Sequence, residues 1–88
     1  MTSRGTELFW KLYAALPVDI KAAARKGFAR FREDQAHPSL HLKRLRSDSR
    51  AWSVRVTLNY RAVAYRRGED WVWIWIGNHR DFDKEFPV

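Results

Sequence analysis

Hydrophobic residues in the first third of the chain recur at the spacing of α-helices. Apolar positions from Leu8 to Leu16 fall on one side of a helix, and Thr6 precedes them as a residue type that caps helix N-termini. Pro17 then interrupts the pattern, because proline disfavours a helix interior but suits the first turn of a new helix. A second apolar stripe follows over residues 20–31. The pattern predicts two tightly joined helices, either an antiparallel hairpin or one long kinked helix.

Beyond these helices, polar and apolar residues alternate as they do in β-strands. The clearest alternation covers residues 51–58, and residues 40–45, 61–67 and 71–76 are typical of further strands. Because the connections between them are short, the strands should form an antiparallel meander. The predicted fold class is α+β: an N-terminal antiparallel helix hairpin packed on one face of a three- to four-stranded antiparallel sheet. The other face is expected to stay open.

Length and composition predict a single domain over residues 1–88, since a chain of this size has no room for a second core. The absence of cysteine excludes a disulfide framework and thiolate metal sites. No apolar run approaches the roughly 20 residues of a membrane helix, and residues 1–5 lack the apolar centre of a signal peptide. We therefore expect a cytoplasmic protein with no membrane partner, no metal and no small-molecule cofactor.

The net charge of +7 is concentrated in one block, residues 37–67. This block holds eight basic residues against one acidic residue, whereas the rest of the chain holds nine of each. A confined excess of positive charge indicates a polyanionic partner, and we expect RNA. Because charged and apolar residues alternate, the charges should gather on one face of the sheet. The eight residues are Lys43, Arg44, Arg46, Arg50, Arg55, Arg61, Arg66 and Arg67.

Candidate chemistry lies on either side of one predicted turn and just after the last strand. Arg55 and Arg61 flank the turn and can therefore lie close together, where their planar guanidinium groups suit phosphate. His79 and Arg80 follow the last strand. Cleavage of RNA at a 2′-hydroxyl requires a base, an acid and positive charge, which histidine and arginine can supply. The alternative for each is an ordinary surface residue, and the acidic residues of the same tail are expected to pair with arginines or to solvate it.

Three tryptophans alternate along the last predicted strand. Trp71, Trp73 and Trp75 should share one face of the sheet because side chains on a strand alternate with a period of two. If that face is open, the indoles offer a stacking platform worth about 1–3 kcal/mol per base. If it meets the helices, they are core residues.

The order of several short motifs resembles the RelE/ParE superfamily of toxins from bacterial toxin–antitoxin pairs, in particular a compact RelE- or HigB-like branch. The resemblance covers about residues 8–86. Two helices are followed by Leu-Lys-Arg-Leu (42–45), Trp-Ser-Val-Arg-Val (52–56), Asn-Tyr-Arg-Ala-Val (59–63), Trp-Ile-Gly-Asn-His (75–79) and Phe-Asp (82–83).

The resemblance implies a metal-independent endoribonuclease that cuts mRNA on the ribosome and is inhibited by a cognate antitoxin, expected to be acidic and partly disordered. The ParE branch of the same fold inhibits DNA gyrase without cleaving RNA, so a gyrase inhibitor or an orphan interaction module is the alternative. The implied catalytic residues are His79, Arg61, Arg55 and Arg80. The implied RNA-binding residues are Lys43, Arg44, Arg46, Arg66, Trp73, Trp75 and Phe82.

The sequence departs from the family pattern at both ends. Many members begin with a strand, for which residues 1–5 offer little. Several nucleases of the family have a tyrosine where this chain has Phe82, which keeps a ring for stacking but lacks the hydroxyl.

Overall fold

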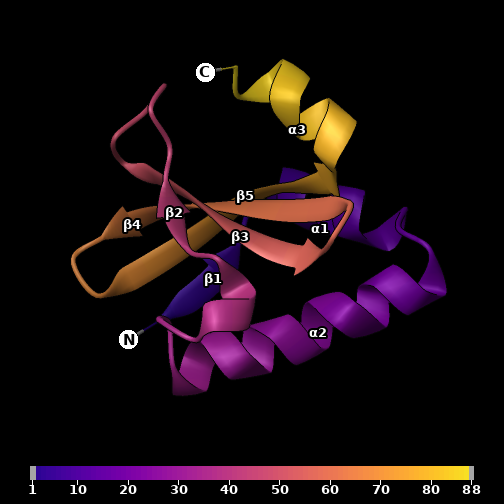
Figure 1. Cartoon of the computed structure of the whole chain (residues 1–88), viewed down its shortest axis with the longest axis horizontal. Helices are drawn as coiled ribbons and strands as arrows, with labels where there is room; N and C mark the ends of the chain where they lie inside the picture. Colours follow the sequence, from indigo (N-terminus) through magenta and orange to yellow (C-terminus); the bar gives the residue numbers. More distant parts are fainter. Residues whose placement is uncertain (1, 88) are drawn as a thin grey trace.

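The computed structural model describes residues 2–87, which form a five-stranded sheet with helices on both faces (Figure 1). The strand order is β1-β5-β4-β3-β2. The helices are α1 (Glu7–Ala14), α2 (Val18–Glu33), the short 3-10 helix η1 (Pro38–Leu40) and α3 (His79–Glu85). The strands are β1 (Ser3–Gly5), β2 (Lys43–Arg44), β3 (Ala51–Thr57), β4 (Tyr60–Arg67) and β5 (Asp70–Asn78). The α+β class with two N-terminal helices on one face is confirmed.

Each of the two N-terminal helices begins next to the residue that the sequence indicates, Thr6 for α1 and Pro17 for α2. The Thr6 hydroxyl accepts a hydrogen bond from the backbone N–H of Phe9 at 3.2 Å and so caps α1. Pro17 stands directly before α2, and residues 15–17 separate the two helices. The chain therefore does not form one long helix. Helix α1 packs mainly on β5 and α2 on β3, so both cover the same face of the sheet.

The N-terminus adds a strand that the sequence does not indicate. Ser3–Gly5 pairs in parallel with residues 71–73 at the edge of the sheet. A three-residue edge strand is held by backbone hydrogen bonds and needs no alternating side-chain pattern. The prediction that residues 1–5 offer little for a strand is therefore wrong for Ser3–Gly5, while Met1 lies outside the described residues. The sheet is mixed and has five strands instead of three or four antiparallel ones.

Asp70 anchors this edge strand and makes its attachment sensitive to acid. The Thr2 hydroxyl and backbone N–H donate to the Asp70 carboxylate at 2.6 and 3.1 Å. These hydrogen bonds, the hydroxyl first, hold the pKa of Asp70 below its ordinary value of 3.8. A lowered pKa stabilises the fold above the unfolded-state value, and this stabilisation is lost as pH falls through the folded-state value.

We therefore expect the Asp70→Asn variant to lose less stability than the wild type on acidification below about pH 4. The effect should be small because Asp70 is exposed. Urea unfolding between pH 2 and 6 measures it, with the neighbouring exposed Glu69→Gln as the control. Parallel pH profiles for the wild type and Asp70→Asn would show that this contact contributes nothing.

The segment before β3 is less extended than predicted. Of the predicted strand over residues 40–45, only Lys43–Arg44 pairs with β3. Residues Pro38–Leu40 instead form η1, because His37 Nδ1 accepts a hydrogen bond from the Ser39 backbone N–H and caps the turn.

A β-bulge in β5 changes which side chains face the helices. Val63 lies opposite Trp75 and Ala64 lies opposite Trp73, so Ile74 is an extra residue with no partner of its own on β4. An extra residue shifts the alternation by one position, and side chains after it point to the other face. The bulge therefore places Trp71 and Trp73 on one face of the sheet and Trp75 on the other.

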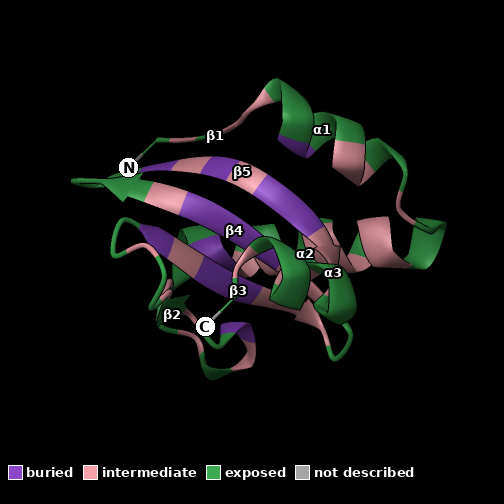
Figure 2. Ribbon diagram, turned by 90° about the horizontal axis from the view of Figure 1, so that it is seen from above, coloured by how far each residue is buried: buried purple, intermediate pink, exposed green. Residues whose placement is uncertain are grey.

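Trp71 and Trp73 lie under the helices, with Phe31 of α2 at 5.0 and 5.3 Å from their ring centroids. Trp75 lies on the opposite face, 6.1 Å from the ring of Phe82 in α3. The prediction that all three share one face is wrong, because it assumed an unbroken alternation. Figure 2 shows the buried positions along β3, β4 and β5 between the two layers of helices.

The face expected to be open is partly covered by α3. Phe82 and Phe86 pack on Trp75, with 5.6 Å between the ring centroids of Phe86 and Trp75. The sheet therefore has a hydrophobic core on each side. Helix α3 covers the second core, which contains Trp75. Among the residues described, no helix is long and apolar enough to cross a membrane.

Candidate functional site

The basic residues of the central block lie on both faces of the sheet. Residues opposite one another on antiparallel strands project to the same side. Arg61 lies on the α3 side, where Asp83 acts on its charge, and Lys43 lies opposite Ser53 on that same side. Arg55 pairs with Arg61 across β3 and β4, next to a β-bulge, and also lines the pocket between α1 and α2. Arg44 and Arg66 project on the other side, over tryptophans at the edge of the helix-side core. The prediction that the charges share one face is wrong, because basic residues occupy both alternations of these strands.

Arg55 and Arg61 form an uncompensated pair of positive charges. Burial, and then the charge of Arg55, lowers the pKa of Arg61, while Asp83 acts in the opposite direction. Arg55 Nε is buried and, among residues 2–87, has no hydrogen-bond partner. In the same part of the chain, no carboxylate lies within 4.0 Å of either guanidinium group. Two like charges without a counter-ion favour the binding of an anion.

Helix α3 places a histidine and an aspartate beside this pair. The Asn78 side chain caps the helix by accepting a hydrogen bond from the Asp81 N–H at 2.8 Å. The His79 backbone N–H donates to the Asn59 carbonyl at 2.6 Å, which ties the start of α3 to the β3–β4 turn. His79 Nε2 lies 3.5 Å from Asp83 Oδ2. The structure therefore fixes this ring at a strand end and gives it a carboxylate neighbour.

Together, Arg55, Arg61, His79 and Asp83 make up what we name the α3-side site. Asp83 connects its two halves because it contacts His79 and acts electrostatically on Arg61. The sequence analysis did not select Asp83, since the acidic residues of this tail were expected to pair with arginines or to solvate it. Once residues 79–85 are helical, the spacing of four places the His79 and Asp83 side chains on the same face.

The other residues predicted for this site are arranged less closely. Lys43 on β2 and Arg46 in the following loop are exposed, as is Arg80 on α3. Phe82 is partly buried, and its ring centroid lies 6.1 Å from that of His79 and 6.1 Å from that of Trp75. Phe82 thus lies next to the α3-side site and also packs on Trp75 in the core beneath α3.

Trp73 and Trp75 are core residues. Their exposed fractions are 7% and 8%. A base can stack only on an open ring face. Burial therefore leaves no room for the stacking predicted for these two residues, and the correction follows from the β-bulge and from the cover by α3.

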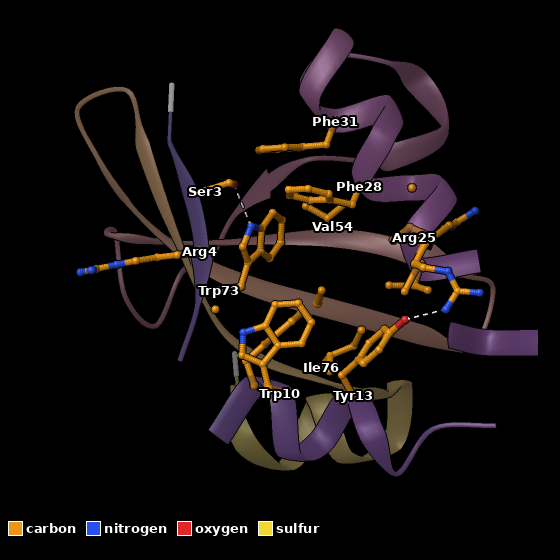
Figure 3. Close-up of a pocket in the computed structure, with 17 residues that line it drawn as sticks. Ser3, Arg4, Trp10, Tyr13, Arg25, Phe28, Phe31, Val54, Trp73 and Ile76 are labelled. Atoms are coloured by element: carbon orange, nitrogen blue, oxygen red, sulfur yellow. Dashed lines mark hydrogen bonds between the residues drawn. The ribbon is translucent and has the colours of Figure 1, made fainter. Parts of the chain in front are cut away.

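An apolar pocket that the sequence analysis did not predict lies between α1 and α2 (Figure 3). Its volume is about 320 Å³. Trp10 and Tyr13 reach into it from α1, and Phe28 reaches in from α2. Trp10 is 54% exposed, and the Tyr13 hydroxyl accepts a hydrogen bond from Arg25 Nη1 at 2.9 Å. The feature of the sequence that points to this pocket is the broad apolar surface of the first helix. This surface is larger than the area that contact with the sheet covers.

Among residues 2–87, no group of three or more histidine, cysteine, aspartate or glutamate side chains is arranged to hold a metal ion.

Comparison with known proteins gives one family and a set of structural relatives. A model of the ParE-like toxin domain matches residues 18–84. No curated protein sequence matches the chain. A chain of the RelB–RelE antitoxin–toxin complex from Methanococcus jannaschii superposes with a TM-score of 0.76 at 14% identity, covering 94% of this chain and 98% of that one. The YoeB/ParE toxin from Agrobacterium tumefaciens gives 0.71 at 18%, covering 90% and 99%. These likenesses show a shared fold.

Proposed function

This chain belongs to the ParE-like toxin domain family, within the RelE/ParE superfamily, and from this premise we propose that it is the toxin of a toxin–antitoxin pair and an endoribonuclease that cleaves mRNA on the ribosome. The observation that supports this proposal is the Arg55–Arg61 pair. Its two guanidinium groups have no carboxylate partner and lie beside a histidine that has one. Phosphate is the ligand that such a pair suits best.

The α3-side site holds the groups that cleavage of RNA at a 2′-hydroxyl requires. Arg55 and Arg61 bind the scissile phosphate and stabilise the extra negative charge that develops as the 2′-oxygen attacks phosphorus. The bond to the 5′-oxygen breaks as the new bond forms. As general base, His79 takes the proton of the 2′-hydroxyl, and water protonates the departing 5′-oxygen. As general acid, His79 protonates that oxygen, and water takes the proton of the 2′-hydroxyl. In either role Asp83 orients the ring of His79. Exposed Lys43 and Arg46 contact the flanking phosphates.

The test is a translation assay with a defined mRNA in which the 5′ ends of the products are mapped. The wild type should produce cuts in phase with codons. His79→Asn should reduce the cleavage rate by about 10²-fold or more, the usual size of a general acid–base contribution, while ribosome binding is retained. His41→Asn is the matched control, because His41 is exposed and has a φ of 48°, a conformation that asparagine tolerates.

If the wild type left mRNA intact and translation unaffected, the nuclease proposal would be wrong. A supercoiling assay with DNA gyrase then separates the two remaining roles. Inhibition of gyrase would identify a ParE-type toxin, and no effect would identify an interaction module.

For the partner, we propose an antitoxin whose apolar side chains enter the pocket between α1 and α2. Trp10 and Phe28 line it and are 54% and 36% exposed, so the free protein leaves a sizeable aromatic surface in water. With a net charge of +7 on the toxin, an acidic and partly disordered segment is the complementary ligand.

A further inference from the structure

A second group of arginines lies on the side of the sheet opposite the α3-side site. The guanidinium carbon of Arg44 is 4.9 Å from the ring centroid of Trp52. That of Arg66 is 5.9 Å from the same ring and 5.4 Å from the ring of Trp71. Two guanidinium groups from different strands therefore share one indole. We name this group the Trp52 cluster.

Cation–π contacts hold these arginines near the indole rings and leave their hydrogen-bond donors free. A guanidinium group donates hydrogen bonds within its own plane, so contact with a ring face uses none of them. Arg66 Nε donates to the Gly68 carbonyl at 3.0 Å, which fixes the direction of that side chain further. Among residues 2–87, no carboxylate lies within 4.0 Å of either group. The Trp52 cluster thus presents exposed, oriented donors with an uncompensated charge of two.

The position of the cluster separates it from the strand that is cleaved. Arg44 lies on β2 and Arg66 on β4, with β3 between them, so their backbones are about 10 Å apart across the sheet and are also offset by two residues along it. Both project to the helix side, whereas Arg61 projects to the α3 side near Asp83. A single strand bound at one site would have to pass around the sheet edge to reach the other. The two sites therefore suit different RNA segments.

The chemistry of the cluster favours double-helical RNA over a single strand. Single strands are held largely by bases that stack on open aromatic rings. Here the guanidinium groups of Arg44 and Arg66 lie over the Trp52 ring, and the Trp71 side chain is buried. The Trp52 cluster therefore presents hydrogen-bond donors to phosphate but no open ring on which a base can stack. Duplex RNA is recognised mainly through its backbone and shape.

We propose that Arg44 and Arg66, stacked on Trp52, form a second phosphate-binding site that holds the backbone of double-helical RNA. Binding of duplex RNA at this site is separate from the cleavage assigned to the α3-side site. Only the identification of this duplex as part of the ribosome rests on the proposed function. Binding at this site raises the local concentration of toxin without touching the scissile phosphate.

The experiment measures equilibrium binding of the full chain to a blunt-ended RNA duplex over a range of salt concentrations. Arg44→Gln with Arg66→Gln should weaken binding at least tenfold and reduce the slope of log K against log salt by about 2, one for each lost phosphate contact. The matched control is Arg25→Gln with Arg32→Gln, which removes the same charge from α2 and includes Arg32, an arginine stacked on Phe28. The control should leave the slope unchanged.

Equal slopes for the two double variants would overturn the proposal, and so would an equal or larger loss of affinity for a single strand of the same length. If the glutamine variant folds poorly, Arg44→Lys with Arg66→Lys keeps the charge but loses the stacked planar group, and it should still bind the duplex more weakly than the wild type. Because duplex binding is read without cleavage, a chain that binds duplex but leaves mRNA intact contradicts only the proposed function.

Discussion

Arg61→Met should reduce mRNA cleavage by about 10²–10³-fold, the usual cost of removing one donor to a developing negative charge, without lowering the melting temperature. Methionine keeps the buried stem of the side chain but removes its charge. Arg61 is partly buried beside Arg55, and both effects lower its pKa. Removing the charge relieves this repulsion, so stability should rise or stay the same while activity falls.

The anion itself provides a second measurement. Added phosphate should raise the melting temperature of the wild type, because a ligand that binds only the folded state stabilises it. It should do so less in Arg61→Met. Arg67→Met is the control, since Arg67 is exposed at the end of the same strand. Unreduced cleavage in Arg61→Met would remove the residue from the site, and a melting temperature lowered by several degrees would assign it a structural role.

Trp73→Ala should lower the free energy of unfolding by about 3–5 kcal/mol, the usual cost of removing a large buried aromatic side chain. The ring lies against Phe9 and Phe31, and its Nε1 donates to the Ser3 hydroxyl at 3.1 Å. A domain of this kind is stable by only about 5–15 kcal/mol, so the variant should lose a large share of its stability and unfold at a clearly lower urea concentration. Urea unfolding followed by circular dichroism measures the loss.

The control for this variant is Trp10→Ala. Trp10 is 54% exposed, so its removal should affect stability far less. A Trp73→Ala chain with unchanged stability and weakened RNA binding would mean that Trp73 stacks on a base after all and that the core assignment is wrong.

The helices and the arginine pair could be predicted from the sequence because their signals are local. Thr6 and Pro17 mark helix boundaries by their own chemistry. Arg55 and Arg61 flank one short turn, which brings them close together, and a β-bulge at Val56 then places them opposite one another. The residue pattern also gave the helices-plus-sheet topology and the position of His79 after the last strand, and the family resemblance added the catalytic role expected of His79.

The remaining features depend on pairing between distant segments, which a pattern of residue types does not encode. Ser3–Gly5 becomes a strand only because β5 offers it an edge. The bulge at Ile74 arises from the register of β4 against β5, and it moves Trp75 away from Trp73. His79 and Asp83 become neighbours only when α3 has folded against the second core. Of these three features, only the bulge changed the face on which candidate residues were expected.

The pairing of β1 with β5 also has a consequence for biosynthesis. Thr2 and Asp70, which join at this edge, are 68 positions apart. A ribosome adds about 5–20 residues per second, so roughly 3–14 s pass between the synthesis of the two. During that interval the nascent chain carries an N-terminal segment with no edge to join, and α1 has no β5 to cover. The β1 segment is thus among the last to reach its native place, although it is made before the other strands, and the toxin fold is completed only after nearly all of the sheet has been translated.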